Sequence, residues 1–241
     1  MFASVVICFG MSSTSFFINI LGYLTKQPEL KCIFTGSNDA KDCMVEDICN
    51  EDSRIASWQI TEESLDNWNT RLNLMCEPSW KVGFLNSAFF LGWCFTMLWV
   101  PRFSDRNGRW WMFMYAMIID TALYTVLLWT RDANIMILVL FAFGLFSSIR
   151  LNVGFVYLME LLPRHKHTLI TTCWCVGEGS IYLLATVYFN SISKDWTPLG
   201  LLGYLMQVIA MLGTFFIPES PALLMETGRT EEAKDSLEWI A

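Results

Sequence analysis

The sequence Arg102-Phe103-Ser104-Asp105-Arg106-Asn107-Gly108-Arg109-Trp110 separates two long apolar segments of the chain. Residues 82–101 before it carry no charge, and residues 111–130 after it carry only Asp120. About 20 apolar residues cross a bilayer as a helix, so both segments are predicted membrane spans joined by a tight loop. Gly108 supplies the backbone freedom that such a reversal needs. Short loops rich in arginine stay in the cytoplasm, and this loop contains three arginines.

Composition indicates a membrane protein. The chain has 241 residues, of which 54% are hydrophobic and 16% charged, a balance that excludes an ordinary soluble domain. The formal net charge is −7, and we expect no nucleic-acid partner because no basic surface is evident. The apolar run over residues 2–24 has no basic segment before it and is long enough to span. It is therefore predicted to remain as a helix, not to be cleaved as a signal peptide.

The apolar runs predict an all-α membrane protein with six transmembrane helices. These helices cover residues 1–24, 81–101, 111–130, 133–159, 168–190 and 197–217. Residues 25–80 form a large loop after the first helix, residues 102–110 form the tight loop, and residues 218–241 begin a linker. Basic residues favour one set of short loops: Arg102, Arg106, Arg109, Arg164 and Lys166, against Arg131 and Lys194. This asymmetry predicts cytoplasmic termini and an outer loop, in the plasma membrane or an endomembrane.

Four cysteines in the predicted outer loop favour disulfide bonds. They are Cys32, Cys43, Cys49 and Cys76. Two bonds in an oxidising compartment are the favoured prediction, with three pairings open and free thiols as the alternative. A zinc site is disfavoured because the spacing is irregular and the loop has no histidine. We expect no metal and no cofactor.

Three motifs resemble those of the major facilitator superfamily of secondary transporters. Asp105-Arg106-Asn107-Gly108-Arg109 resembles the cytoplasmic loop between the second and third helices of that fold. Tyr157-Leu158-Met159-Glu160-Leu161-Leu162-Pro163 resembles the end of its fourth helix, and Pro218-Glu219-Ser220-Pro221 resembles the segment after its sixth. The large cysteine-bearing loop is similar to that of the organic cation and anion transporters. The resemblance covers the whole chain, as the N-terminal half of a twelve-helix fold.

By this resemblance, the motif residues form a cytoplasmic latch that holds two six-helix halves together. The implied gating residues are Asp105, Arg106, Gly108, Arg109, Glu160, Pro218, Glu219, Ser220 and Pro221. Their charged members are expected to find partners on a second six-helix bundle, either further along the gene or from another chain.

This chain also departs from the family pattern. Pro101 and Thr96 stand where the family usually has glycine, although Gly92 is kept. Basic residues are replaced at three positions: Trp110, His167 and Ala222. These departures predict a weaker latch.

Three ionisable residues lie inside the predicted spans: Asp120, Arg150 and Glu178. Each is about ten residues from the cytoplasmic end of its helix, which at 1.5 Å per residue places it roughly 15 Å deep. An ionisable group at that depth is normally buried and paired. We expect an ion-paired cluster with Arg150 between the two acids, and Glu178 as the partner to test first. Asp120 is interpreted as a structural charge, whereas for Arg150 and Glu178 a substrate or proton role and a structural role remain equally open.

Asn19 and Asn152 complete the candidate substrate residues, because an amide in hydrocarbon needs a partner or a water-filled cavity. Aromatic residues in the spans are either cation–π ligands or lipid-facing anchors: Phe16, Phe17, Trp93, Tyr157, Trp174 and Tyr182.

The sequence therefore predicts half of a transporter for a small organic ion or related solute, working by alternating access in a lipid bilayer. The alternative is a non-transporting six-helix scaffold subunit of a larger membrane complex. An enzyme is not expected, since the chain shows no nucleophile–base pair, metal spacing or phosphate loop.

Overall fold

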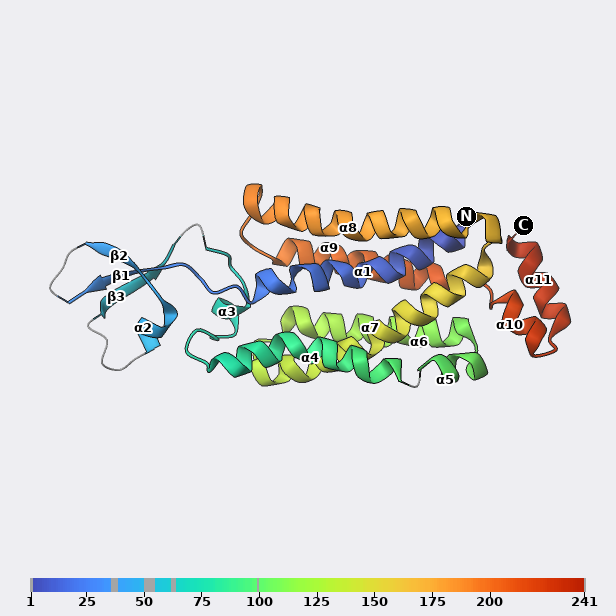
Figure 1. Cartoon of the computed structure of the whole chain (residues 1–241), viewed down its shortest axis with the longest axis horizontal. Helices are drawn as coiled ribbons and strands as arrows, with labels where there is room; N and C mark the ends of the chain where they lie inside the picture. Colours follow the sequence, from blue (N-terminus) through green and yellow to red (C-terminus); the bar gives the residue numbers. More distant parts are fainter. Residues whose placement is uncertain (1, 36–38, 50–54, 62–63, 99, 241) are drawn as a thin grey trace.

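Six long helices lie side by side in one elongated bundle (Figure 1). They are α1 (Phe2–Leu24), α4 (Ser79–Met97), α6 (Arg109–Trp129), α7 (Ala133–Leu161), α8 (His167–Ser191) and α9 (Thr197–Thr214). The structure is a computed structural model that describes residues 2–35, 39–49, 55–61, 64–98 and 100–240. The short helices α5 (Val100–Asn107), α10 (Pro221–Glu226) and α11 (Thr230–Ile240) lie at one end, called the motif end. A small sheet lies at the other end, called the sheet end.

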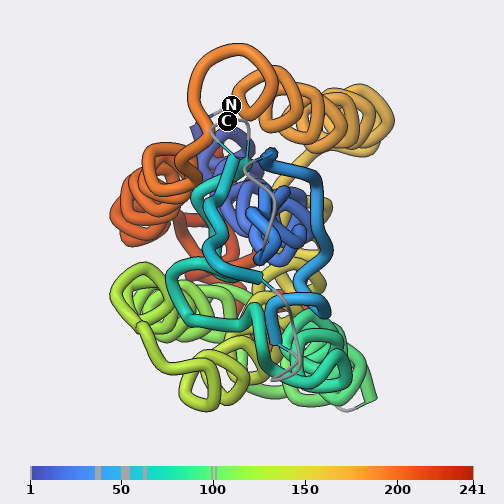
Figure 2. The backbone as a smooth tube through the Cα atoms, turned by 90° about the vertical axis from the view of Figure 1, so that its left-hand side faces the viewer, coloured from blue at the N-terminus to red at the C-terminus, as the bar shows by residue number. Residues whose placement is uncertain are grey.

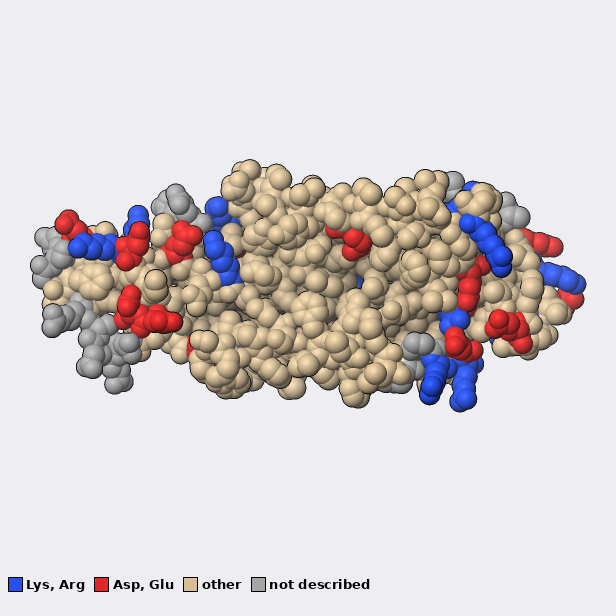
Figure 3. Space-filling model, viewed as in Figure 1, with Lys and Arg blue, Asp and Glu red and all other residues tan. Residues whose placement is uncertain are grey.

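Charged residues lie mainly at the two ends of the elongated bundle. Figure 3 shows charged side chains gathered at the motif end and the sheet end, with an almost uncharged surface between them. Within the described residues, five helices are long and apolar enough to cross a membrane: α1, α6, α7, α8 and α9. Helix α4 has 19 residues but is not among these five. It carries Lys81 and Asn86, which lower its hydropathy.

The helices pack in two groups around α1 and α7 (Figure 2). Helix α1 contacts α7, α8 and α9, while α7 contacts α4 and α6. Helix α6 also contacts α9, so α1, α6, α7 and α9 enclose the buried centre of the bundle. Helix α8 joins the bundle mainly through α1, and much of its surface is exposed.

Glycines set the closest approach, between α4 and α7. A Cβ atom on Gly92 would overlap the carbonyl oxygen of Phe141, and one on Gly144 would overlap the carbonyl oxygen of Phe89. Small residues allow membrane helices to approach this closely. The hydroxyl of Thr96 donates across the contact to the carbonyl oxygen of Leu145 at 3.2 Å. Thr96 therefore contributes an interhelical hydrogen bond at a position where a glycine would offer only space.

The segment at 102–110 differs from the expected tight loop. Its first part is the short helix α5, which begins at Val100, and the reversal is confined to Gly108. Gly108 has a φ of 106°, which L side chains rarely adopt. One residue with this backbone conformation turns the chain from α5 into α6, so the charged residues before it remain free to form a helix.

The segment between α1 and α4 contains a sheet, which corrects the all-α expectation. Strands β1 (Leu30–Phe34), β2 (Ala40–Cys43) and β3 (Ile55–Ile60) pair antiparallel in the order β2-β1-β3. The same segment includes the short helices α2 (Val45–Cys49) and α3 (Trp68–Arg71). Residues of β3 are mostly exposed, so no alternation of apolar and polar residues marks this strand in the sequence.

Both predicted disulfides are confirmed, and the pairing is resolved. Cys32 bonds Cys43 and links β1 to β2, and Cys49 bonds Cys76 and links α2 to the approach to α4. The two Cα–Cα distances are 5.8 and 5.4 Å.

Candidate functional site

Arg109 joins three helices at the motif end. Its guanidinium donates to the carboxylate of Glu160 on α7, with an Nη2–Oε1 distance of 3.2 Å. It also donates to Asp105 on α5 at 2.5 Å and to the hydroxyl of Ser104 at 3.1 Å. Opposite charges on α5, α6 and α7 thus meet in one cluster, in which hydrogen bonds strengthen each ion pair.

Glu219 caps the first turn of α6. Its Oε1 accepts from the backbone N–H of Arg109 at 3.0 Å, of Trp110 at 2.9 Å and of Ser220 at 3.0 Å. A carboxylate at this point satisfies backbone donors that have no partner within the helix, and it faces the positive end of the helix dipole. A Cβ on Gly108 would lie 2.6 Å from Glu219 Oε2, so the glycine leaves room for this cap.

Two of the positions at which the family pattern has a basic residue, Trp110 and His167, form contacts within the chain. The indole N–H of Trp110 donates to the carbonyl oxygen of Thr214 at 2.9 Å, which ties α6 to the end of α9. His167 Nε2 lies 2.9 Å from the carbonyl oxygen of Leu162. Tyr157 donates to the carbonyl oxygen of Pro218, and Ala222 lies within α10.

These contacts correct the expectation that the latch charges would look for partners outside the chain. Asp105, Arg109, Glu160 and Glu219 all have partners within it. Arg106 is exposed. Ser220 caps α10 by accepting from the backbone N–H of Leu223, and Pro221 is the first residue of that helix. The motif end is therefore held together by the chain itself.

We expect Glu219→Ala to destabilise the chain by about 2 kcal/mol, because two partly buried N–H groups of α6 lose their acceptor. Glu219→Gln should cost roughly half as much, since the amide oxygen still accepts but lacks the charge. The measurement is thermal unfolding of the purified chain in detergent. Glu226→Ala, which removes an exposed carboxylate at the end of α10, is the matched control and should leave the midpoint unchanged. Equal shifts for Glu219→Ala and Glu226→Ala would contradict the capping role.

A second cluster lies deep in the bundle, around Asp120 and Arg150. Arg150 Nη1 is 3.3 Å from Asp120 Oδ2, and the two side chains are 1% and 0% exposed. Ser147 donates to Asp120 at 3.0 Å. The amide of Gln207 on α9 donates to Asp120 at 3.3 Å, and Arg150 donates to the hydroxyl of Ser13 on α1 at 3.0 Å. Four helices thus share one buried polar network.

This network corrects the expected partner of Arg150. Asp120 is paired with it, and among the described residues no ion pair joins Arg150 to Glu178. Arg150 is buried, and its Nε and Nη2 have no hydrogen-bond partner among the described residues. The sequence analysis did not select Ser13, Ser147 or Gln207. The feature that could have identified these three residues is a polar side chain within an apolar helix, at about the same depth as Asp120.

Glu178 occupies a different position, between α1 and α8. Its Oε2 accepts from the hydroxyl of Ser15 on α1. Its Oε1 is buried, with no hydrogen-bond partner among the described residues. Two turns further along the same contact, Tyr23 and Thr186 share a hydrogen bond of 3.1 Å. Asn19 lies between Ser15 and Tyr23 at helical spacing, so it lies on the same face of α1.

Asn152 on α7 lines a cavity, which reaches α8 at Trp174. Its amide donates to the carbonyl oxygen of Ser148 at 2.8 Å. The cavity measures about 450 Å³ and is also bordered by Asp105, Arg109 and Trp174. It therefore runs from the charged cluster of the motif end toward the middle of α7 and α8.

The predicted aromatic residues divide into two groups. Phe16, Phe17 and Tyr157 are buried in the core. Trp174 contacts Phe155, and Tyr182 is 51% exposed on α8. Trp174 and Tyr182 lie one helical turn before and after Glu178 on α8.

Comparison with known proteins decides the family. Residues 4–241 match the sugar (and other) transporter family. The chain belongs to this family, within the major facilitator superfamily. The matching segment reaches all six long helices, and the mostly helical fold is consistent with a major facilitator N-terminal half.

Individual relatives of this superfamily member are membrane transporters and not enzymes. It is 26% identical to human organic cation/carnitine transporter 2 over 186 residues, covering 76% of this chain and 33% of that protein. It is 28% identical to mouse solute carrier family 22 member 4, covering 76% of this chain and 35% of the relative. A sugar transporter of Arabidopsis thaliana, ERD6-like 18, is 38% identical over 34% of this chain and 17% of its own length. The chain spans about a third of the first two relatives.

Proposed function

We propose that this chain is the N-terminal half of a transporter that moves a small organic cation across a membrane by alternating access. The observation that carries the proposal is the state of Glu178. Its carboxylate lies halfway along α8, and one of its oxygens has no partner among the described residues. An ionisable group inside a membrane is costly unless it is paired, so a positively charged solute is the partner that this carboxylate lacks.

The surroundings of Glu178 support a solute with both charge and apolar surface. Tyr182 follows Glu178 by one helical turn and Trp174 precedes it by one, so all three lie along one side of α8. The face of a tyrosine or tryptophan attracts organic cations. Asn19 lies across the same contact and offers an amide that a polar substituent of the solute can bind. In this proposal, Arg150 stabilises the helix bundle through its ion pair with Asp120 and does not bind the solute.

The same proposal includes an orientation. All six long helices cross the membrane, with α4 included because Gly92 packs it against α7. The motif end lies in the cytoplasm with both termini, as its arginines favour, and the sheet end lies outside. Two disulfides at the sheet end favour an oxidising compartment for that side. The plasma membrane or an endomembrane fits this arrangement.

A second six-helix bundle completes the proposed transporter. Substrate sites in such transporters lie near the bilayer midplane between two bundles that rock against each other. The cavity lined by Asp105, Arg109, Asn152 and Trp174 lies on the face that we assign to this second bundle. It comes from the continuation of the gene or from another chain, including a second copy.

The test is uptake of tetraethylammonium by liposomes containing the purified chain, with the mass of the protein measured in the same preparation. We expect saturable uptake only from species with two bundles, and Glu178→Gln to lower it by at least about tenfold because the charge is lost. Glu178→Asp should keep part of the activity. The matched control is Ser180→Ala, on the same helix, whose hydroxyl bonds only the carbonyl oxygen of Val176.

Two outcomes would contradict the proposal. One is saturable uptake by a strictly monomeric six-helix species. The other is cation uptake that Glu178→Gln leaves unchanged. Absence of both uptake and cation binding in a two-bundle species would favour the alternative, a scaffold subunit. That alternative is supported by the motif charges, which are already paired within the chain.

A further inference from the structure

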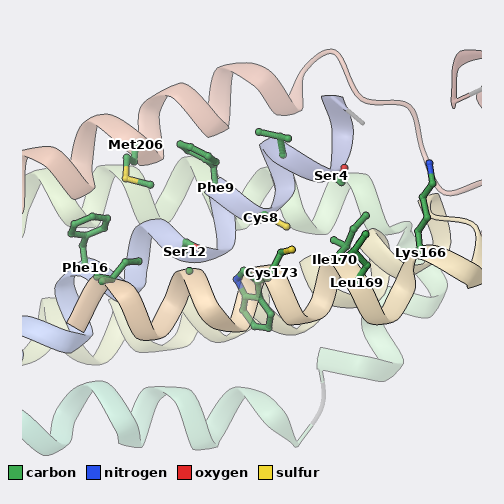
Figure 4. A pocket seen from close by; sticks show the side chains of 14 residues that line it. Ser4, Cys8, Phe9, Ser12, Phe16, Lys166, Leu169, Ile170, Cys173 and Met206 are labelled. Carbon is green, nitrogen blue, oxygen red and sulfur yellow. The ribbon is translucent and has the colours of Figure 1, made fainter. Parts of the chain in front are cut away.

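A groove of about 560 Å³ lies over α1, between α8 and α9. Figure 4 shows Ser4, Cys8, Phe9, Ser12 and Phe16 of α1 along it, Ile170 and Cys173 of α8 on one side, and Met206 of α9 on the other. Because α8 joins the bundle mainly through α1, its first half and α9 are separated by this groove. The groove and the cavity beside Asn152 are separate hollows that share one wall residue, Trp174 of α8.

The lining is almost entirely apolar, and the groove is open to the outside. Val5, Phe9 and Leu169 on its walls are 52%, 45% and 64% exposed. Gly177 adds room, because a Cβ at this position would find no atom within 4 Å. An exposed apolar hollow of this kind marks a binding site for an apolar group.

The length of the groove matches one leaflet of a bilayer. Its α1 wall extends from Ser4 to Phe16, thirteen residues separated by twelve helical steps, which is about 18 Å at 1.5 Å per step. Half of the hydrocarbon core is about 15 Å thick. The groove also runs along the helix axes, in the direction that lipid chains take in a membrane.

One charged side chain stands at the end of the groove. Lys166 lies at the start of α8, at the motif end, and Figure 4 shows its amine beyond the apolar lining. Arg164 and His165 precede it, and all three residues are exposed. Among the described residues, the ion pairs of the chain do not include Lys166. A cation at the rim and apolar walls along one leaflet fit an amphipathic anion.

We propose that the groove binds an acyl chain of an anionic phospholipid from the leaflet at the motif end, with the phosphate on Lys166. The apolar chain lies along α1 from Phe9 to Phe16, and the headgroup stays at the rim. Basic residues at this depth attract anionic lipids, and the apolar walls add the binding of each buried methylene. The lipid would hold the first half of α8 against α1 and α9, where protein contacts are sparse.

The test uses phosphatidylcholine vesicles that contain phosphatidylglycerol with a diazirine on its acyl chain. After illumination, labelled peptides are mapped by mass spectrometry. We expect label on residues 4–16 and 169–181. Gly177→Leu fills the groove and should lower this label by at least about tenfold. Gly179→Leu is the matched control, because Gly179 also has no atom within 4 Å but does not line the groove.

The headgroup is tested with a second pair of variants. Lys166→Gln should reduce the preference for phosphatidylglycerol over phosphatidylcholine by about fivefold, while Lys194→Gln, at the other end of α8, should leave it unchanged. The natural cysteines give a measurement without any variant. Phosphatidylglycerol should slow maleimide labelling of Cys173 in the groove and leave Cys175, which is exposed outside it, unaffected.

Several results would overturn the proposal. They are acyl label spread evenly over all membrane helices, equal effects of Gly177→Leu and Gly179→Leu, or equal protection of the two cysteines. Cross-links between two copies of the chain through residues 4–16 would assign the groove to a protein contact instead.

Discussion

Replacing Arg150 with methionine is expected to abolish folding of the chain, and adding Asp120→Leu is expected to restore much of it. In the single variant, the carboxylate of Asp120 stays buried and keeps the neutral donors Ser147 and Gln207 but loses its cation. Breaking a buried ion pair by removing one partner costs about 3–5 kcal/mol, whereas replacing both partners with apolar residues is often neutral. The double variant should therefore be more stable than Arg150→Met alone.

The measurement is the yield of monodisperse protein and its thermal midpoint in detergent, for both single variants and the double variant. The control is Arg150→Met combined with Glu178→Gln, which removes an acid that does not pair with Arg150 and should restore nothing. If Glu178→Gln restored the protein and Asp120→Leu did not, the pairing seen in the structure would be wrong. Additive losses for Arg150→Met and Asp120→Leu would show that the two residues do not interact.

The partner of Arg150 shows what the sequence can and cannot specify. Counting residues from the helix ends placed Asp120, Arg150 and Glu178 at a common depth, because the rise of a helix is constant. Pairing also depends on the direction in which each side chain points around its helix, and that direction is set by which helices are neighbours. Asp120 faces α7 because α6 packs on α7, whereas Glu178 faces α1.

The motif end was predicted in a similar, partial way. The resemblance selected Asp105, Arg109, Glu160 and Glu219, and the structure brings all four together. The contact of Glu219 with α6 was not predictable from the motifs, because it requires the chain after α9 to return to the start of α6. Trp110 contributes to that return through its bond to Thr214. The indole of Trp110 thus links α6 to α9 at a position where the family pattern has a basic residue.

The outer segment was the least predictable part of the fold. Its cysteines could be predicted to pair, since four thiols lie close in sequence, but their pairing depends on the register of β1 with β2. That sheet has few buried residues, so hydrophobic periodicity does not reveal it. The apolar helices carry a much stronger signal because lipid and the bundle core both select against charge.

Replacing Gly144 with alanine is expected to separate α4 from α7 and to destabilise the bundle by about 3 kcal/mol, at the upper end of the usual cost of overpacking. The added Cβ would overlap the carbonyl oxygen of Phe89, which is part of the helix backbone and cannot rotate away. Sliding α4 does not relieve the overlap, because Gly92 makes the reciprocal contact with the carbonyl oxygen of Phe141. The hydrogen bond from Thr96 to Leu145 would be lost as well.

The matched control for this prediction is Gly179→Ala, at a helix position where a Cβ meets no atom within 4 Å. Alanine favours a helix over glycine by about 0.5–1 kcal/mol, so this variant should raise the thermal midpoint while Gly144→Ala lowers it. Equal midpoints for the two variants would mean that α4 does not depend on its contact with α7. A large loss at Gly144 alone would show that α4 is held in the bundle by backbone packing, and that its modest hydropathy does not decide its place there.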